Sequence, residues 1–190
     1  MRIGRICVFC GSSAGVRPVY REAAVELGRT LAKAGIGVVY GGSHVGLMGA
    51  VADAALEAGG HVIGVIPESM VAREIAHRGL TDLRVVASMH ERKALMADLS
   101  NAFIALPGGF GTLDEFCEAL TWSQLGIHRK PCGLLNLEGY YDPLLALFDH
   151  AVREGFLKVE NRALVLAGGS VEGLLNQLAE WASGRMVYFR

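Results

Sequence analysis

Three features of the chain predict an α/β fold in which helices cover both faces of a parallel β-sheet. Short runs of β-branched and apolar residues alternate with longer segments whose apolar residues recur at three- and four-residue spacing. Glycine-rich turns follow three of the short runs, where a strand would lead into a helix. Hydrophobic residues make up 52% of the 190 residues, which is enough for a substantial core. We therefore expect one domain spanning residues 1–190.

The alternation of strand and helix runs through the whole chain. In chain order, the predicted pairs of strand and helix are 6–9 with 18–34, 38–40 with 47–58, 62–66 with 90–100, 103–106 with 112–125, and 133–137 with 142–154. Runs 83–86 and 163–166 could add short strands, and Leu174, Leu175 and Leu178 predict a closing helix over 171–181. Repeated strand–helix–strand units place parallel strands in one sheet. The predicted architecture is a doubly wound, Rossmann-like sheet.

Charge and hydropathy exclude several classes of partner. Lys and Arg number 18 against 19 Asp and Glu, so no overall field attracts nucleic acid or an acidic membrane surface. No apolar run approaches the roughly 18 residues of a transmembrane helix, and residues 1–9 lack the length and cleavage pattern of a signal peptide. We expect a cytoplasmic protein with neither a nucleic-acid nor a membrane partner.

The four cysteines are scattered rather than spaced as a disulfide framework. They are Cys7, Cys10, Cys117 and Cys132. Cys7 and Cys10 lie in or at the end of a predicted strand, where a separation of three residues places their side chains on opposite faces. That geometry is poor for a shared metal ion, so we expect buried thiols that act as small apolar residues.

The three glycine-rich turns, 11–13, 41–46 and 107–112, are expected at one edge of the sheet, where ligands bind in such folds. Glycines let backbone N–H groups approach an anion, and the N-terminus of the following helix adds partial positive charge. The sequence contains neither G-x-x-x-x-G-K-[ST] nor G-x-G-x-x-G, and its six histidines are dispersed without H-E-x-x-H. These features predict a nucleotide site unlike those of P-loop kinases, ordinary dehydrogenases and H-E-x-x-H metal hydrolases.

Glu115 has two interpretations. It ends the stretch 107–115, so a phosphorylated sugar bound at the glycine turn would lie within its reach. Thr112 and Glu115 also have the spacing of a capping box, in which a glutamate at the third helical position bonds back to the N-cap amide. Spacing alone does not separate the catalytic interpretation from the capping one.

Arg92 and Lys93 favour the functional interpretation. They lie near the start of the predicted helix 90–100, where cations oppose the helix dipole. Ser88 and Glu91 already have the spacing of a capping box for this helix, so the basic pair is not needed there. An anion is therefore the expected partner of the two cations.

Two motifs resemble the signatures of a known family, the LONELY GUY proteins, which are cytokinin riboside 5'-monophosphate phosphoribohydrolases. The motifs are Met-His-Glu-Arg-Lys at 89–93 and Pro-Gly-Gly-Phe-Gly-Thr-Leu-Asp-Glu at 107–115, at the family's spacing, and the resemblance covers nearly the whole chain. Together they imply Glu115 and Arg92 as catalytic residues. The implied substrate-binding residues are Ser13, Gly42, Glu74, Met89, Lys93, Gly108, Gly109, Phe110, Gly111, Thr112, Leu113, Asp114 and Thr121.

The resemblance implies hydrolysis of the N-glycosidic bond of adenosine 5'-monophosphate, plain or N6-prenylated, giving free adenine or cytokinin base and ribose 5-phosphate. Cleavage at C1' develops oxocarbenium character, which Glu115 would stabilise while it orients or deprotonates the attacking water. Arg92 stays protonated, so it would orient phosphate or ribose rather than act as a general acid. This chemistry needs no metal or organic cofactor, and the family resemblance favours a homodimer. The preferred base and the group that protonates it are left open.

Two other functions were weighed against hydrolysis. Such proteins are often labelled lysine decarboxylases, but pyridoxal phosphate chemistry needs a Schiff-base lysine, and only Lys93 lies near the predicted site. A non-catalytic carrier of a nucleotide or cofactor is the stronger alternative, and it would have no use for a carboxylate at the sugar. One departure from many relatives is Glu68, where a lysine is expected, and it bears on contacts to the base or ribose.

Overall fold

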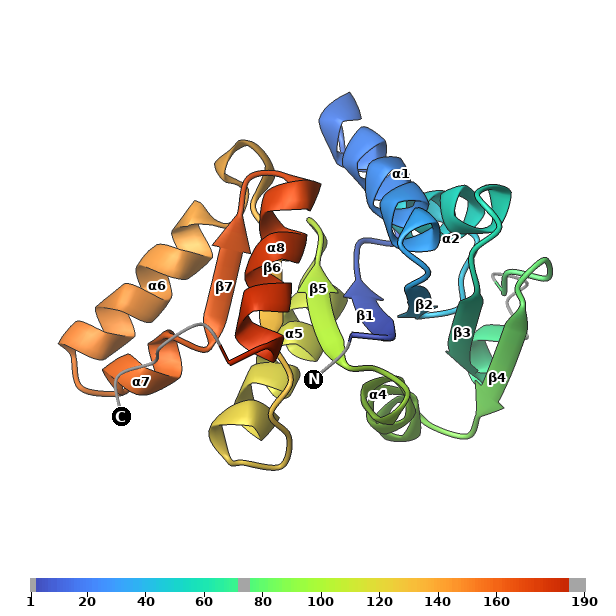
Figure 1. Cartoon of the computed structure of the whole chain (residues 1–190). Coiled ribbons are helices and arrows are strands. Elements are labelled where there is room, and N and C mark those ends of the chain that lie inside the picture. Colours follow the sequence, from blue (N-terminus) through green and yellow to red (C-terminus); the bar gives the residue numbers. More distant parts are fainter. Residues whose placement is uncertain (1–2, 72–75, 185–190) are drawn as a thin grey trace.

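The computed structural model describes residues 3–71 and 76–184 (Figure 1). Within these residues, one sheet has seven strands in the order β4-β3-β2-β1-β5-β6-β7, and every neighbouring pair is parallel. The strands are β1 (Arg5–Phe9), β2 (Gly37–Tyr40), β3 (Val62–Pro67), β4 (Asp82–Val86), β5 (Ala102–Ala105), β6 (Cys132–Leu135) and β7 (Val165–Gly168). The doubly wound, Rossmann-like sheet predicted from the alternation is confirmed.

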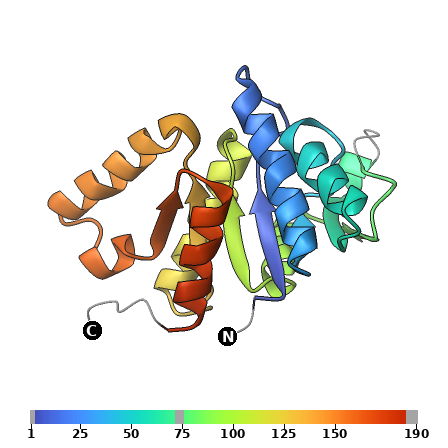
Figure 2. The same cartoon turned by 45° about the horizontal axis from the view of Figure 1, so that its top comes forward.

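Helices cover both faces of the sheet (Figures 1 and 2). The helices on one face are α1 (Pro18–Lys33), α2 (Gly46–Glu57) and α8 (Val171–Ala182), and those on the other are α4 (Met89–Asp98) and α5 (Phe110–Gln124). Helix α6 (Asp142–Arg153) lies beside the β7 edge. The short elements are α3 (Glu68–Val71), α7 (Val159–Arg162) and the 3₁₀ turn η1 (Leu137–Gly139).

Side chains that alternate along each strand build two separate cores. In β1, Ile6 and Val8 pack under α1 and α2, whereas Cys7 and Phe9 pack under α4 and α5. Cys10 belongs to the first core, so Cys7 and Cys10 do lie on opposite faces. Both thiols are free and buried, and burial raises the pKa of each, which keeps them protonated.

The predicted elements are present, with shifted ends. Both short edge strands form, as β4 and β7. Helix α5 begins at Phe110, two residues before the predicted start, because Gly109 takes the extended N-cap position. Helices α3 and α7 are not predicted from the sequence, because four residues are too few to show apolar periodicity. Among the described residues, none of the helices is long and apolar enough to cross a membrane.

The strand order places a topological switch point between β1 and β5. The chain runs outward from β1 to β4 on one side and from β5 to β7 on the other, which leaves a crevice at the carboxyl ends of the two central strands. Gly11 ties the turns together there. Its N–H donates to the Pro107 carbonyl at 3.1 Å, and its carbonyl accepts from the Leu47 N–H at 3.1 Å. The three glycine-rich turns therefore meet at one edge, as predicted.

Candidate active site

A cavity of about 360 Å³ opens at this switch point. Its walls come from the turns after β1, β2 and β5 and from the first turns of α4 and α5. The lining residues are Cys10, Gly11, Ser12, Gly41, Ser43, Val45, Met48, Met70, Met89, Arg92, Gly109, Phe110, Gly111, Thr112, Asp114 and Glu115. The volume is that of a small-molecule site.

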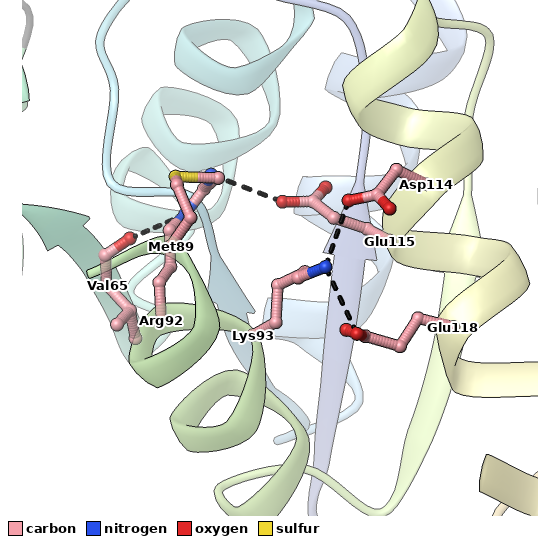
Figure 3. Close-up of polar contacts among 7 residues, drawn as sticks. All are labelled: Val65, Met89, Arg92, Lys93, Asp114, Glu115 and Glu118. Carbon is pink, nitrogen blue, oxygen red and sulfur yellow. Dashed lines mark hydrogen bonds and ion pairs between the residues drawn. The ribbon is translucent and has the colours of Figure 1, made fainter.

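Arg92 is a buried cation held in a fixed orientation. Its Nε donates to the Val65 carbonyl at 3.1 Å, and its Nη1 lies 3.6 Å from the Met89 sulfur and 3.2 Å from Glu115 Oε1 (Figure 3). Only 7% of the residue is exposed. A Cβ at Gly41 would collide with Arg92 Nη2, so glycine in the turn after β2 makes room for the guanidinium.

The structure separates the two interpretations of Glu115. Thr112 lies inside α5 rather than at its N-cap, so the capping box of Thr112 and Glu115 does not form. The Glu115 carboxylate instead points across the cavity at Arg92 (Figure 3). Burial raises the pKa of Glu115 above its ordinary value, and this effect outweighs the nearby Arg92, which lowers it. The pair thus places a buried base candidate beside a permanent cation.

Half of the capping box predicted for the preceding helix forms, and its return bond reaches the amide one residue before the N-cap. The Ser88 hydroxyl accepts from the Glu91 N–H at 3.1 Å at the start of α4. The Glu91 carboxylate accepts from the Ala87 N–H at 2.8 Å, one residue before the N-cap. Capping therefore leaves Arg92 and Lys93 free for carboxylate partners.

Lys93 does not line the cavity and pairs with two carboxylates of α5. Its ammonium lies 3.1 Å from Asp114 and 3.1 Å from Glu118, both on α5 (Figure 3). Partial burial lowers the pKa of Lys93, but the hydrogen bonds that its ammonium donates to Asp114 and Glu118 outweigh burial and leave that pKa raised. Lys93 therefore joins α4 to α5, the two helices that carry Arg92 and Glu115.

The N-terminus of α5 supplies amides for an anion. The N–H groups in the first turn of a helix have no intrahelical acceptor, and Gly109 has no side chain to cap them. A Cβ built at Gly109 or at Gly111 would have no described atom within 4 Å, so both glycines border open space. Thr112, whose residue surface is only 3% exposed, lines the same wall. This arrangement suits a phosphate group.

Eight of the predicted site residues line the cavity, and the others lie elsewhere. The eight are Met89, Arg92, Gly109, Phe110, Gly111, Thr112, Asp114 and Glu115. Ser13 and Gly108 line a neighbouring cavity of about 320 Å³, and Thr121 lines another of about 140 Å³ beside α7. Leu113 packs against the core under α5, and Gly42 (φ 74°) packs close to Ile66. Glu74 lies outside the described residues.

Several lining residues were not predicted as site residues. Ser12 and Gly41 belong to glycine-rich turns that the sequence does single out, so their position after β1 and β2 is a usable signal, whereas Met48 lies on α2 beyond the turn 41–46. Cys10 was assigned to the core, yet it also borders the cavity. Met70, on the four-residue α3, had no signal at all.

The sequence is similar to one family model and to curated plant proteins. A family model described as "Possible lysine decarboxylase" matches residues 48–178. The probable cytokinin riboside 5'-monophosphate phosphoribohydrolase LOGL1 of Oryza sativa subsp. japonica is 52% identical over 180 residues, which cover 95% of this chain and 81% of that protein. Cytokinin riboside 5'-monophosphate phosphoribohydrolase LOG7 of Arabidopsis thaliana is 52% identical over 180 residues, which cover 95% and 83%.

Solved structures share the fold at lower identity. The Moco carrier protein from Chlamydomonas reinhardtii is 24% identical with a TM-score of 0.72, and the match covers 96% of this chain and 99% of that one. The molybdenum cofactor binding protein from the phototrophic bacterium Rippkaea orientalis is 25% identical with a TM-score of 0.70, covering 95% and 98%. Because about half of its residues are identical to those of the plant enzymes over nearly its whole length, the chain belongs to the LONELY GUY family of cytokinin riboside 5'-monophosphate phosphoribohydrolases.

Proposed function

We propose that the chain hydrolyses the N-glycosidic bond of adenosine 5'-monophosphate, plain or N6-prenylated, and releases the free base and ribose 5-phosphate. The observation that carries the proposal is the buried Arg92–Glu115 pair in a cavity that also contains the N-terminus of α5. A phosphate at that N-terminus would bring the attached ribose to the carboxylate. The names of the relatives supply the substrate class.

In this mechanism Glu115 acts on the sugar and on water. As the bond from C1' to the base lengthens, positive charge develops on the ribose, and an ionised carboxylate close by stabilises it. Water then attacks C1', and Glu115 orients it and accepts its proton. The raised pKa of Glu115 makes its carboxylate a stronger base than that of an exposed glutamate.

Arg92 keeps Glu115 ionised and oriented. Its guanidinium does not deprotonate, so its role is electrostatic, through Glu115 and through the ribose or phosphate of the substrate. The fixed bond to the Val65 carbonyl prevents the cation from swinging out of the cavity. We assign no residue to protonation of the departing base.

The description of the family model as a lysine decarboxylase does not fit Lys93. A Schiff-base lysine needs a free amine that reaches the cavity. The Lys93 ammonium is instead paired with Asp114 and Glu118, and these bonds raise its pKa. Lys93 therefore supports the site as a link between helices.

A cofactor carrier is the second candidate, because the molybdenum cofactor binding protein of Rippkaea orientalis shares this fold at 25% identity. A carrier needs the glycine turns but gains nothing from a buried carboxylate at the sugar. The identity of 52% to the plant phosphoribohydrolases and the Arg92–Glu115 pair both favour hydrolysis.

A comparison of three candidate substrates tests the proposed function. Wild-type protein is incubated with AMP, with isopentenyladenosine monophosphate and with adenosine, and the free base is quantified chromatographically. We expect base from one or both monophosphates and little from adenosine, which lacks the phosphate that the α5 N-terminus would bind. Base from adenosine at an equal rate would contradict the role of the phosphate. The ratio of the two monophosphate rates gives the preferred base.

We also propose that the protein is a cytoplasmic homodimer, with residues 1–190 acting as one nucleotide-binding domain. Phe110 lines the cavity but is 94% exposed, so its ring needs a cover that a second copy could provide. The four free thiols suit a reducing compartment. Sedimentation equilibrium is expected to give twice the chain mass of 20.3 kDa, and a single chain mass at micromolar concentration would contradict the dimer.

Substitution of Asp114 by Asn is expected to move the acid limb of the kcat profile to lower pH. The negative charge of Asp114 raises the pKa of Glu115, so its removal lowers that pKa. Activity requires ionised Glu115, which is lost as pH falls through its pKa; a lower pKa therefore extends activity into more acidic buffer. Glu118→Gln is the matched comparison, because Glu118 raises the same pKa less. An acid limb that stays fixed in both variants would show that Glu115 does not control it.

A further inference from the structure

The carbonyl groups of residues 106–109 all have described hydrogen-bond partners. The donors are the Tyr141 hydroxyl to Leu106 (2.6 Å), the Gly11 N–H to Pro107 (3.1 Å), the Tyr140 hydroxyl to Gly108 (2.7 Å) and the Leu113 N–H to Gly109 (3.1 Å). Both tyrosines come from the segment between β6 and α6, which takes no part in the mechanism described above. The turn that would hold the phosphate is therefore hydrogen-bonded by a separate part of the fold, through Tyr140 and Tyr141.

The bond from Tyr140 fixes the direction of an amide. In a trans peptide the carbonyl of one residue and the N–H of the next point in opposite directions. Tyr140 and Gly108 line the neighbouring cavity of about 320 Å³, whereas Gly109 lines both that cavity and the one with Arg92. A Gly108 carbonyl held toward Tyr140 turns the Gly109 N–H away from Tyr140, and the other cavity that Gly109 lines is the one with Arg92 and Glu115.

We propose that Tyr140 is a positioning residue for the phosphate site: its hydroxyl holds the Gly108–Gly109 peptide so that the Gly109 N–H is available to the phosphate of the substrate. This inference rests on the proposed function, because it assumes that the substrate phosphate binds at the α5 N-terminus. It concerns a residue that lies outside both family motifs and outside the cavity that contains Glu115.

The peptide needs such a restraint because it joins two glycines. Glycine populates conformations that other residues avoid, and packing restrains only one end of this peptide. A Cβ at Gly108 would collide with Thr112, whereas a Cβ at Gly109 would meet nothing beyond its chain neighbours. If the peptide turned over, a carbonyl oxygen would face the phosphate in place of an N–H. Tyr140 is itself well placed: its N–H donates to the Leu137 carbonyl at 3.0 Å, and its ring meets the Tyr141 ring edge to face at 5.0 Å.

Tyr141 provides a matched control within the same turn. Its hydroxyl holds the Leu106 carbonyl, but the next residue is Pro107, which has no N–H to offer an anion. Tyr141 is almost fully buried, and its loss would leave a buried carbonyl without a partner. Tyr141→Phe should therefore reduce thermal stability, whereas Tyr140→Phe should reduce affinity for phosphate.

The test compares wild type, Tyr140→Phe and Tyr141→Phe in three measurements: KM and kcat for AMP, the inhibition constant of ribose 5-phosphate, and the melting temperature. For Tyr140→Phe we expect KM and the inhibition constant to rise about fivefold, the effect of one lost hydrogen bond, with kcat within about twofold. For Tyr141→Phe we expect a lower melting temperature with both constants near the wild-type values.

Two results would overturn the inference. One is a Tyr140→Phe protein whose KM for AMP and inhibition constant match those of the wild type. The other is the same loss of affinity in both variants, which would mean that the hydroxyls only stabilise the turn. If the wild type itself releases no base from AMP, the proposed function fails, and binding of ribose 5-phosphate to the same three proteins still decides the role of Tyr140.

Discussion

Replacement of Glu115 by Gln is expected to lower kcat for AMP hydrolysis by about 10³-fold, since the amide neither accepts a proton from water nor stabilises positive charge on the ribose. The side chain keeps its shape, and the α5 N-terminus that would bind phosphate is unchanged. The dissociation constant for AMP should therefore stay within about threefold of the wild-type value. Single-turnover kinetics and calorimetry measure the two quantities separately.

Glu118→Gln is the control for that experiment. Glu118 lies on the same helix and carries the same charge, but it contacts Lys93 rather than the cavity. We expect a kcat within a few-fold of the wild type. A Glu115→Gln protein that retains a tenth of the wild-type rate would show that Glu115 is not the catalytic base. Equal losses of kcat in the two variants would show that the substitutions act by disturbing helix α5.

Substitution of Arg92 by Met is expected to impair both activity and stability. It leaves the Glu115 carboxylate buried without its cation, so the pKa of Glu115 rises further and a larger fraction of the base is protonated at a given pH. Breaking a buried ion pair from one side destabilises a protein by about 3 kcal/mol. We expect kcat to fall by about 10²-fold at neutral pH, with partial recovery in alkaline buffer.

The stability of the Arg92→Met protein should depend on pH in a defined direction. A folded-state pKa above the unfolded value means that stability is present at low pH and lost as pH rises through the folded pKa. Denaturation at pH 5.5 should therefore show a smaller deficit than denaturation at pH 8. The double variant with Glu115→Gln should recover part of the loss, because no buried charge remains. Equal deficits at both pH values, with no recovery, would contradict coupling between the two residues.

The fold could be predicted from the sequence because its strands and long helices carry regular apolar patterns. Helix ends were less certain, and at α5 the difference matters. Spacing made Thr112 a possible N-cap, whereas in the structure Gly109 occupies that position and Glu115 is left to pair with Arg92. A glycine offers no side chain by which a sequence pattern could reveal it as a cap.

The site could be predicted only in part. Adjacent residues on a helix point about 100° apart, and only the structure shows that Arg92 faces the cavity while Lys93 lies behind it with Glu118. Thr121 lies further along α5, facing α7 rather than Glu115. The sulfur-containing wall of Met48, Met70 and Met89 depends on three separate elements meeting, which a linear pattern does not encode.

We expect this cavity to cleave the bond between ribose and base rather than merely to hold a nucleotide. The most direct test measures AMP binding and base release on one preparation of wild-type protein, with AMP and with isopentenyladenosine monophosphate. We predict binding of at least one nucleotide, accompanied by stoichiometric free base and ribose 5-phosphate. Saturable binding of both nucleotides with no release of base from either would contradict the claim and identify a carrier.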